Sequence, residues 1–410
     1  MRHSVNLLAE PSPPATLLSP RPAPAAPVCP PDAKADAGLS EPIWLWQGYV
    51  PSLNGLRALS ILLVIVSHLA HKPNTPFSYP FLHPLGAIGV EMFFVISGFL
   101  ITLLLLREQR RQGTVSLTDF FLRRIFRIVP AYAFFLLVLV GMELTGLIHI
   151  PAISWLRAVT YTTSLFGFES GGQDLAHTWS LSVEEHFYLL WPGLFLLLGT
   201  RISILTAVEC VVLTPFLRFG LHYSFGASCP DFAYFSPTRM DAIAVGCCLA
   251  FGATSPIFRR ATGLATKWST VAVVAGTLLI LWLCRFPALF DDIKSLASLE
   301  PFLASTLKPI ILAWMVWTCV RTPHNLVGKV LNCKFLNHLG ILSYSLYIWQ
   351  QVFLHPERTH WTCDWPYNVC FAFVAALLSY FLIEKPFLVV KERLALARKS
   401  RSPRTDEVKS

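Results

Sequence analysis

Long apolar segments constrain this chain more than any other feature. Crossing the hydrocarbon core of a bilayer takes about 20 residues of α-helix, because each residue adds about 1.5 Å along the helix axis. Only 14% of the 410 residues are charged, whereas soluble domains average about 25%. The sequence therefore predicts an all-α polytopic membrane protein with about ten transmembrane helices. The segments expected to span are 53–71, 84–106, 128–149, 178–199, 201–220, 237–254, 268–289, 302–320, 335–355 and 366–384.

The distribution of Lys and Arg predicts the orientation of these helices. The loop 107–127, REQRRQGTVSLTDFFLRRIFR, carries six arginines, and the positive-inside rule places such a loop in the cytoplasm. If the short segment 152–168 stays on the outer face or re-enters instead of crossing, the later basic loops also fall inside. We therefore expect both termini to be cytoplasmic.

The two ends of the chain differ from the membrane domain, which is expected to cover 47–387. Residues 1–46 are rich in Pro and Ala and have no apolar period, so they predict a disordered cytoplasmic tail. Residues 388–410 predict a basic cytoplasmic tail. The net charge of +9 is explained by the Lys and Arg residues of the predicted cytoplasmic loops. We therefore expect contact with membrane lipid and no nucleic acid.

The cysteines do not indicate a metal or redox site. There are ten of them, with no CxxC pair and no ligand-like spacing to a histidine. Buried thiols that pack as small apolar side chains explain this pattern.

Ionisable residues inside the apolar segments are the candidate functional residues. Arg57 and His68 lie eleven residues apart, almost three turns, so both point from one helix face with a separation of roughly 16 Å. Intramembrane ionisable groups are costly and usually face an interior cavity. Counting from the helix ends places further polar residues at the level of His68 or close to it: Glu91, Glu184, Arg239, Asp241 and Gln350.

Each candidate also has a plain structural explanation. Arg57 could reach the lipid headgroups, and His68 could be a satisfied core histidine. The cluster Arg123, Arg124 and Arg127 could only anchor the topology, although it would equally suit a phosphate-rich cytoplasmic ligand. Tyr344 lies on a helix face where tyrosines often serve packing.

Seven motifs, in order, resemble those of the acyltransferase-3 family of integral-membrane acyltransferases. They cover about 50–387, which is nearly the whole membrane domain. The motifs are LRALSILLVIVSH, GVEMFFVISGFLIT, FFLRRIFRIVPAY, HTWSLSVEEHFYLLWP, PTRMDAIAVGCCLA, LGILSYSLYIWQ and FLIEKPF.

The resemblance implies transfer of an acyl group, expected to be acetyl, from cytoplasmic acyl-CoA to a hydroxyl of a sugar, a lipid-linked or cell-surface glycan, or another membrane-presented acceptor. It implies a bacterial inner membrane as the location and no tightly bound cofactor or metal. His68 is the expected general base, and Glu184 is expected to orient it. The expected donor-binding residues are Arg57, Arg123, Arg124 and Arg127. The expected acceptor pocket contains Glu91, Arg239, Asp241, Tyr344 and Gln350.

Two positions depart from the family pattern. Glu91 stands in GVE where the family has GVD, and Gln350 stands in YIWQ where the family often has a histidine. Some relatives add a soluble hydrolase-like domain, which we do not expect after Glu384. The same carboxylates and histidine could instead serve a proton-coupled transporter, and Gln350 leaves open a non-catalytic partner protein.

Overall fold

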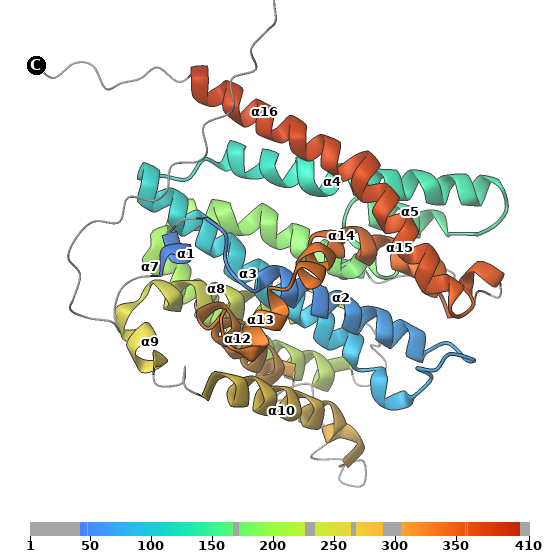
Figure 1. Ribbon diagram of the computed structural model, residues 1–410, viewed down its shortest axis with the longest axis horizontal. Coiled ribbons are helices and arrows are strands. Elements are labelled where there is room, and N and C mark those ends of the chain that lie inside the picture. Colours follow the sequence, from blue (N-terminus) through green and yellow to red (C-terminus); the bar gives the residue numbers. More distant parts are fainter. Residues whose placement is uncertain are drawn as a thin grey trace, which may run out of the picture. The chain divides into compact units, whose positions relative to one another are not determined.

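The computed structural model describes residues 42–46, 48–166, 172–225, 234–263, 268–289, 305–356, 358 and 360–401 (Figure 1). Residues 41–410 form one compact unit, and everything below concerns its described part. The predictions for residues 1–41, for the tail beyond 401 and for the loops around 167–171, 226–233 and 290–304 fall outside it.

Helices form in each of the ten segments predicted to span, and the described residues contain no strand. The all-α prediction is confirmed. The helices are α1 (Ile43–Trp46), α2 (Leu53–Ala70), η1 (Pro80–Leu82), α3 (Leu85–Gln112), α4 (Leu117–Leu144), α5 (Ala152–Val159), α6 (Thr163–Phe166), η2 (Gln173–Leu175), α7 (Thr178–Phe225), η5 (Ser236–Thr238), α8 (Met240–Thr254), α9 (Pro256–Ala261), α10 (Ser269–Leu289), α12 (Ser305–Arg321), α13 (Leu326–Leu331), α14 (Lys334–Leu354), η8 (Trp361–Cys363), α15 (Tyr367–Ser379), η9 (Tyr380–Glu384) and α16 (Lys385–Arg401).

By length and composition alone, five helical stretches in the described part are long and apolar enough to cross a membrane. They are Leu53–Ala70, Pro80–Gln112, Leu117–Leu144, Thr178–Phe225 and Tyr367–Leu394. The 48-residue α7 contains two predicted spans, because Gly199 breaks it with φ 71° and ψ 171°, a conformation that glycine adopts easily. The total of ten spans stays a prediction.

The segment 152–168 does not form a straight transmembrane helix. It contains α5, of eight residues, and α6, of four. Eight residues rise roughly 12 Å, well short of the hydrocarbon thickness of about 30 Å. This agrees with a segment that stays at one face or re-enters.

The start of the membrane domain needs a correction. Ile43–Trp46, assigned to the disordered tail, form α1, and Leu45 is buried. Arg107 donates hydrogen bonds to the carbonyls of Leu45 and Gly48, both at 3.1 Å. The ordered chain therefore begins before residue 47, because the basic end of α3 holds this segment.

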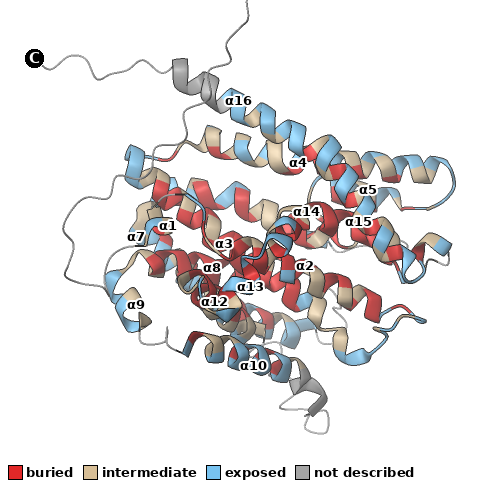
Figure 2. Cartoon of the chain, in the orientation of Figure 1, coloured by how far each residue is buried: buried red, intermediate tan, exposed pale blue. Residues whose placement is uncertain are grey.

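The most buried helices are α2, α3, α8 and α14, and red dominates them in Figure 2. In the apolar stretch of α3, 83% of residues are buried, against 22% in α4 and 11% in α7. The glycines of α3 and α8 permit the closest contact: a Cβ on Gly98 would lie 2.0 Å from the carbonyl oxygen of Ile243. The outer helices keep apolar faces exposed, which suits contact with lipid.

Candidate active site

Three cavities follow α3 from one end to the other. We call them the basic cavity, of about 410 Å³, the central pocket, of about 50 Å³, and the histidine cavity, of about 440 Å³. The central pocket and the histidine cavity share Val90, Phe94 and Tyr347 in their walls. The central pocket therefore adjoins the histidine cavity, whereas the basic cavity, at the Arg-rich end of α3, shares no lining residue with either.

The basic cavity collects most of the predicted donor-binding residues, because α3 and α4 meet at their Arg-rich ends. Its lining includes Glu108, Asp119, Arg107, Arg111, Arg123, Arg124, Arg127 and Lys391. Arg123 pairs with Glu108 at 2.9 Å, and Arg111 donates to the carbonyl of Trp46 at 2.7 Å.

Arg124 and Arg127 differ from these paired arginines. Neither forms an ion pair or a hydrogen bond with any residue of the described chain. Arg124 lies over the ring of Tyr188, 5.1 Å from its centroid. Two guanidinium groups therefore remain available for an anion in this cavity.

Arg57 lies in the central pocket, between the other two cavities. Its principal charged neighbours are Arg127, Glu184 and Arg124, and within the described residues it makes no hydrogen bond or ion pair. The sequence prediction that Arg57 and the Arg124–Arg127 cluster act together thus agrees with their placement.

His68 lies in the histidine cavity at the far end of α2, and one hydrogen bond fixes its tautomer. Its Nδ1 is 2.8 Å from the carbonyl oxygen of Val64. A carbonyl only accepts hydrogen bonds, so Nδ1 carries the proton and donates it, and Nε2 keeps its lone pair. The lone pair gives His68 the form that a general base needs.

The predicted pairing of Glu184 with His68 is not formed. Glu184 accepts hydrogen bonds from Ser97 at 2.9 Å and Tyr188 at 3.0 Å, and it lines the central pocket beside Arg57. The sequence-based estimate placed Glu184 and His68 at one depth because it assumed that all helices end in the same plane of the membrane. The residues of this motif that line the histidine cavity are His177 and Trp179, and His177 lies seven residues and roughly 10 Å earlier than Glu184.

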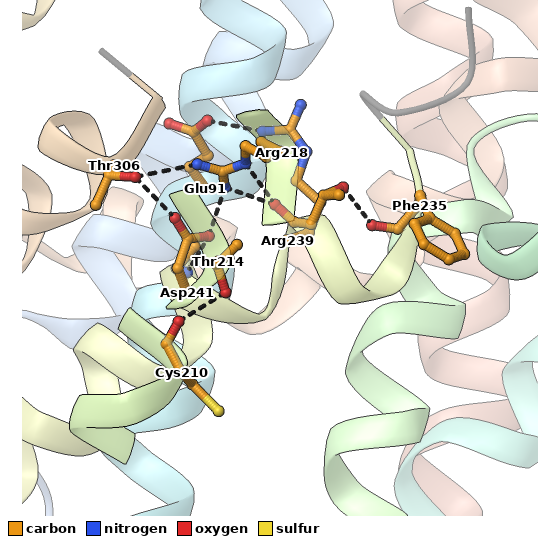
Figure 3. Close-up of polar contacts among 10 residues, drawn as sticks. Glu91, Cys210, Thr214, Arg218, Phe235, Arg239, Asp241 and Thr306 are labelled. Atoms are coloured by element: carbon orange, nitrogen blue, oxygen red, sulfur yellow. Dashed lines mark hydrogen bonds and ion pairs between the residues drawn. The ribbon is translucent and has the colours of Figure 1, made fainter. Parts of the chain in front are cut away.

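Glu91 and Arg239, both assigned to the acceptor pocket from the sequence, meet in the wall of the histidine cavity. Their ion pair measures 3.1 Å, and Figure 3 shows it beside a second pair. Asp241 belongs to that second pair: it binds Arg218 at 2.7 Å and does not line the cavity. Two residues of helix turn a side chain by about 200°, so Arg239 and Asp241 face opposite ways.

Neither of the two residues predicted on α14 lines the histidine cavity. Tyr344 lines the central pocket and donates to the carbonyl of Ile128 at 3.0 Å. Gln350 is fully buried, neither of its amide atoms has a hydrogen-bond partner among the described residues, and it does not line the histidine cavity. Tyr347 and Gln351 line it instead. A change of one residue rotates a side chain by about 100°, and a depth count cannot detect that rotation.

Sequence reasoning also missed three histidines of this cavity: His71, His83 and His177. The rings of His71 and His83 stack with centroids 3.9 Å apart. All three lie where an apolar segment meets a loop, so none of them interrupts the hydropathy pattern. The one available signal was His177, the first residue of the motif HTWSLSVEEH.

Comparison with known proteins identifies the family of the chain. The profile of the acyltransferase domain matches residues 50–384, which include the whole lining of the central pocket and of the histidine cavity, and all of the basic cavity except Gly48 and Lys391. The chain belongs to this acyltransferase family. The resemblance inferred from the seven motifs is confirmed, and the match favours an acyltransferase over a transporter.

Named relatives of this family member are O-acetyltransferases. It is 28% identical to the peptidoglycan O-acetyltransferase OatA of Listeria monocytogenes, over 82% of this chain and 56% of the relative. It is 29% identical to the O-acetyltransferase OatA of Staphylococcus aureus, over 73% of this chain and 50% of the relative. The chain thus spans about half the length of these relatives. No solved structure matches it.

Proposed function

We propose that this family member is a membrane O-acetyltransferase that moves an acetyl group from cytoplasmic acetyl-CoA to a hydroxyl of a cell-surface glycan. One observation carries the proposal: unpaired arginines line a cavity at one end of α3, and a histidine with a free Nε2 lines a cavity at the other end, next to the central pocket that contains Arg57. The relatives named as peptidoglycan O-acetyltransferases support a glycan as the acceptor.

The basic cavity suits the donor. Coenzyme A carries several phosphates, and guanidinium groups bind phosphate oxygens through paired hydrogen bonds. Arg124 and Arg127 can make these bonds without breaking an existing ion pair. Arg57 would hold the donor where it enters the central pocket, so that the thioester extends toward His68.

The chemistry needs two proton transfers, one as the acceptor oxygen attacks and one as the thiolate leaves. The acceptor hydroxyl loses its proton to Nε2 of His68 as its oxygen attacks the thioester carbonyl carbon. The tetrahedral intermediate then breaks its C–S bond, and the leaving thiolate takes the proton from His68. The products are an O-acetyl ester and free coenzyme A, and His68 returns to its neutral form.

The histidine cavity suits the acceptor. Arg239 is already paired with Glu91, so this cavity has a balanced charge, unlike the basic cavity. Arg239 lies 6.0 Å from the ring centroid of Trp179, which supplies an aromatic wall of the kind that neutral sugars pack against. In the proposed orientation this cavity opens outside the bacterial inner membrane, and both chain ends are cytoplasmic.

The test is transfer of labelled acetyl from acetyl-CoA by the full chain in nanodiscs, with chitotetraose as a soluble glycan probe. Labelled acetyl-CoA hydrolysis is measured in parallel. His68→Gln should slow both reactions by about 10²- to 10⁴-fold, the usual contribution of a general base, while acetyl-CoA still binds.

The matched control is His338→Gln. His338 is exposed on α14, and its Nδ1 makes the same type of bond, 2.7 Å to the carbonyl of Lys334. It should retain the wild-type rate. Full transfer by a well-folded His68→Gln protein would contradict the proposed base.

A further inference from the structure

His177 stands apart from the other histidines of the histidine cavity. His68, His71 and His83 each place one ring nitrogen within hydrogen-bond distance of a backbone carbonyl. Within the described residues, neither ring nitrogen of His177 has a hydrogen-bond partner of normal geometry, and the polar contact found there is a weaker one with the backbone of Ile348. The side chain is nevertheless buried, at 5% exposure.

The ring of His177 is held in place by its surroundings and not by its own polar atoms. It packs edge-on against Phe135, with centroids 5.5 Å apart, and against Tyr347 at 5.8 Å. The Tyr347 hydroxyl donates to the backbone carbonyl of His177 at 3.2 Å. The imidazole is therefore fixed by packing, and no hydrogen bond of normal geometry to a described residue commits its N–H. A buried polar group without a partner costs free energy, which a bound ligand can recover.

We propose that His177 is a second catalytic residue, and that its ring N–H donates a hydrogen bond to the thioester oxygen as that oxygen becomes an oxyanion. The assignment rests on the proposed acetyl transfer. A fixed donor aimed at developing charge in a site of low polarity stabilises the transition state strongly.

The two histidines then have complementary roles. The bond to Val64 leaves His68 with an acceptor nitrogen in the cavity, whereas His177 makes only the weaker contact with Ile348, which its N–H can exchange for a ligand. During the reaction His68 gains a proton, and its positive charge disfavours a second charge on a neighbour in the same cavity. His177 consequently stays neutral, keeps its proton and acts only as a donor. The reaction is balanced, because His68 alone takes the proton of the acceptor hydroxyl and passes it to the leaving thiolate.

The test compares His177→Phe, which keeps a flat ring without a polar atom, with His177→Gln, which keeps an N–H donor. His177→Phe should lower kcat for acetyl transfer to chitotetraose, and the rate of acetyl-CoA hydrolysis, by about 10²- to 10³-fold. The Kd for acetyl-CoA and the KM for chitotetraose should stay within twofold of wild type. His177→Gln should recover part of the rate.

The pH profile separates this role from that of a base. The inflection in kcat against pH belongs to His68, so it should remain in His177→Gln at the wild-type position. Loss of the inflection would mean that His177 is the base and would overturn the proposal. A raised KM with unchanged kcat would make His177 a binding residue, and this would also overturn it.

Failure of the two proposals can be told apart. If the wild-type protein does not consume acetyl-CoA, the proposed function fails, and the role of His177 fails with it. If the wild-type protein transfers acetyl and His177→Phe does so at full rate, only the role of His177 fails. Retained binding of acetyl-CoA by each variant shows that it is folded, and His338→Phe is the control for a histidine outside the cavities.

Discussion

At the scale of single residues, hydrogen-bond partners decide which polar side chains are available for chemistry. Arg111 and Arg123 use their guanidinium groups on protein acceptors, whereas Arg57 makes no such bond with a described residue. Only the unpaired group can bind a ligand without losing an existing contact.

Arg57→Lys should raise the KM for acetyl-CoA by about tenfold and leave the protein folded. Lysine keeps the charge but loses the planar pair of donors that matches a phosphate, a difference we take as about 1.4 kcal/mol. Initial rates against acetyl-CoA concentration measure it. Arg201→Lys, at an exposed arginine of α7, is the control. Unchanged donor kinetics in Arg57→Lys would place Arg57 among the structural arginines.

Gln350→Leu should raise the free energy of unfolding, by about 1 kcal/mol. The fully buried amide has no hydrogen-bond partner, and leucine of similar size removes its desolvation cost. Gln351→Leu is the matched comparison, because Gln351 donates to the carbonyl of Gln173 at 3.1 Å and should lose stability. Unfolding in mild detergent, followed by tryptophan fluorescence, measures both. A destabilised Gln350→Leu would indicate that the amide has a role in the folded state.

At the scale of helices, close packing sets where the cavity walls lie. A Cβ on Gly98 of α3 would lie 2.0 Å from the carbonyl oxygen of Ile243 on α8, and a Cβ on Gly246 would lie 2.2 Å from that of Val95. Glu91 lies on α3, and Arg239 directly precedes the first residue of α8. The small residues thus bring the two halves of this ion pair within reach.

Gly98→Ala should destabilise the protein by about 1–3 kcal/mol, the usual cost of overpacking, since backbone atoms cannot move aside as a side chain would. Gly141→Ala in α4 is the matched control, because its added Cβ would meet no atom within 4 Å. It should be neutral or stabilising by about 0.5–1 kcal/mol through helix propensity. Equal stability of the two variants in a detergent unfolding assay would rule out close packing at Gly98.

At the scale of the whole membrane domain, the cavities along α3 differ chemically. Arginines and a lysine surround the basic cavity, and histidines with a paired Glu91 and Arg239 surround the histidine cavity. The proposed function assigns a polyanionic donor to the first and a neutral sugar to the second. The positive-inside rule predicts that the basic cavity faces the cytoplasm.

The orientation predicts opposite labelling of the two ends of α4. In a cysteine-free background, Gln112→Cys, just before α4, should react with a membrane-impermeant maleimide only after cells are opened. Thr145→Cys, just after α4, should react in intact cells. Both positions are exposed, so access alone does not separate them. Labelling of Gln112→Cys from outside would reverse the proposed orientation and the sides of donor and acceptor.

The sequence alone determined the membrane class, the helical segments, the family resemblance and the pairing of Arg57 with His68 on one helix face. These features depend on local properties: the hydropathy of about 20 consecutive residues and the fixed rotation of 100° per residue within one helix. Glu91 and Arg239 were also assigned to one pocket, because their segments end near the same level.

Only the tertiary structure decided which side chains meet across helices. It paired Glu184 with Ser97 and Tyr188, buried Asp241 against Arg218, turned Gln350 away from the cavity and brought His177 into it. Each outcome depends on how neighbouring helices are rotated, tilted and shifted along their axes. Those quantities are set by packing between segments far apart in the chain, so no local pattern encodes them.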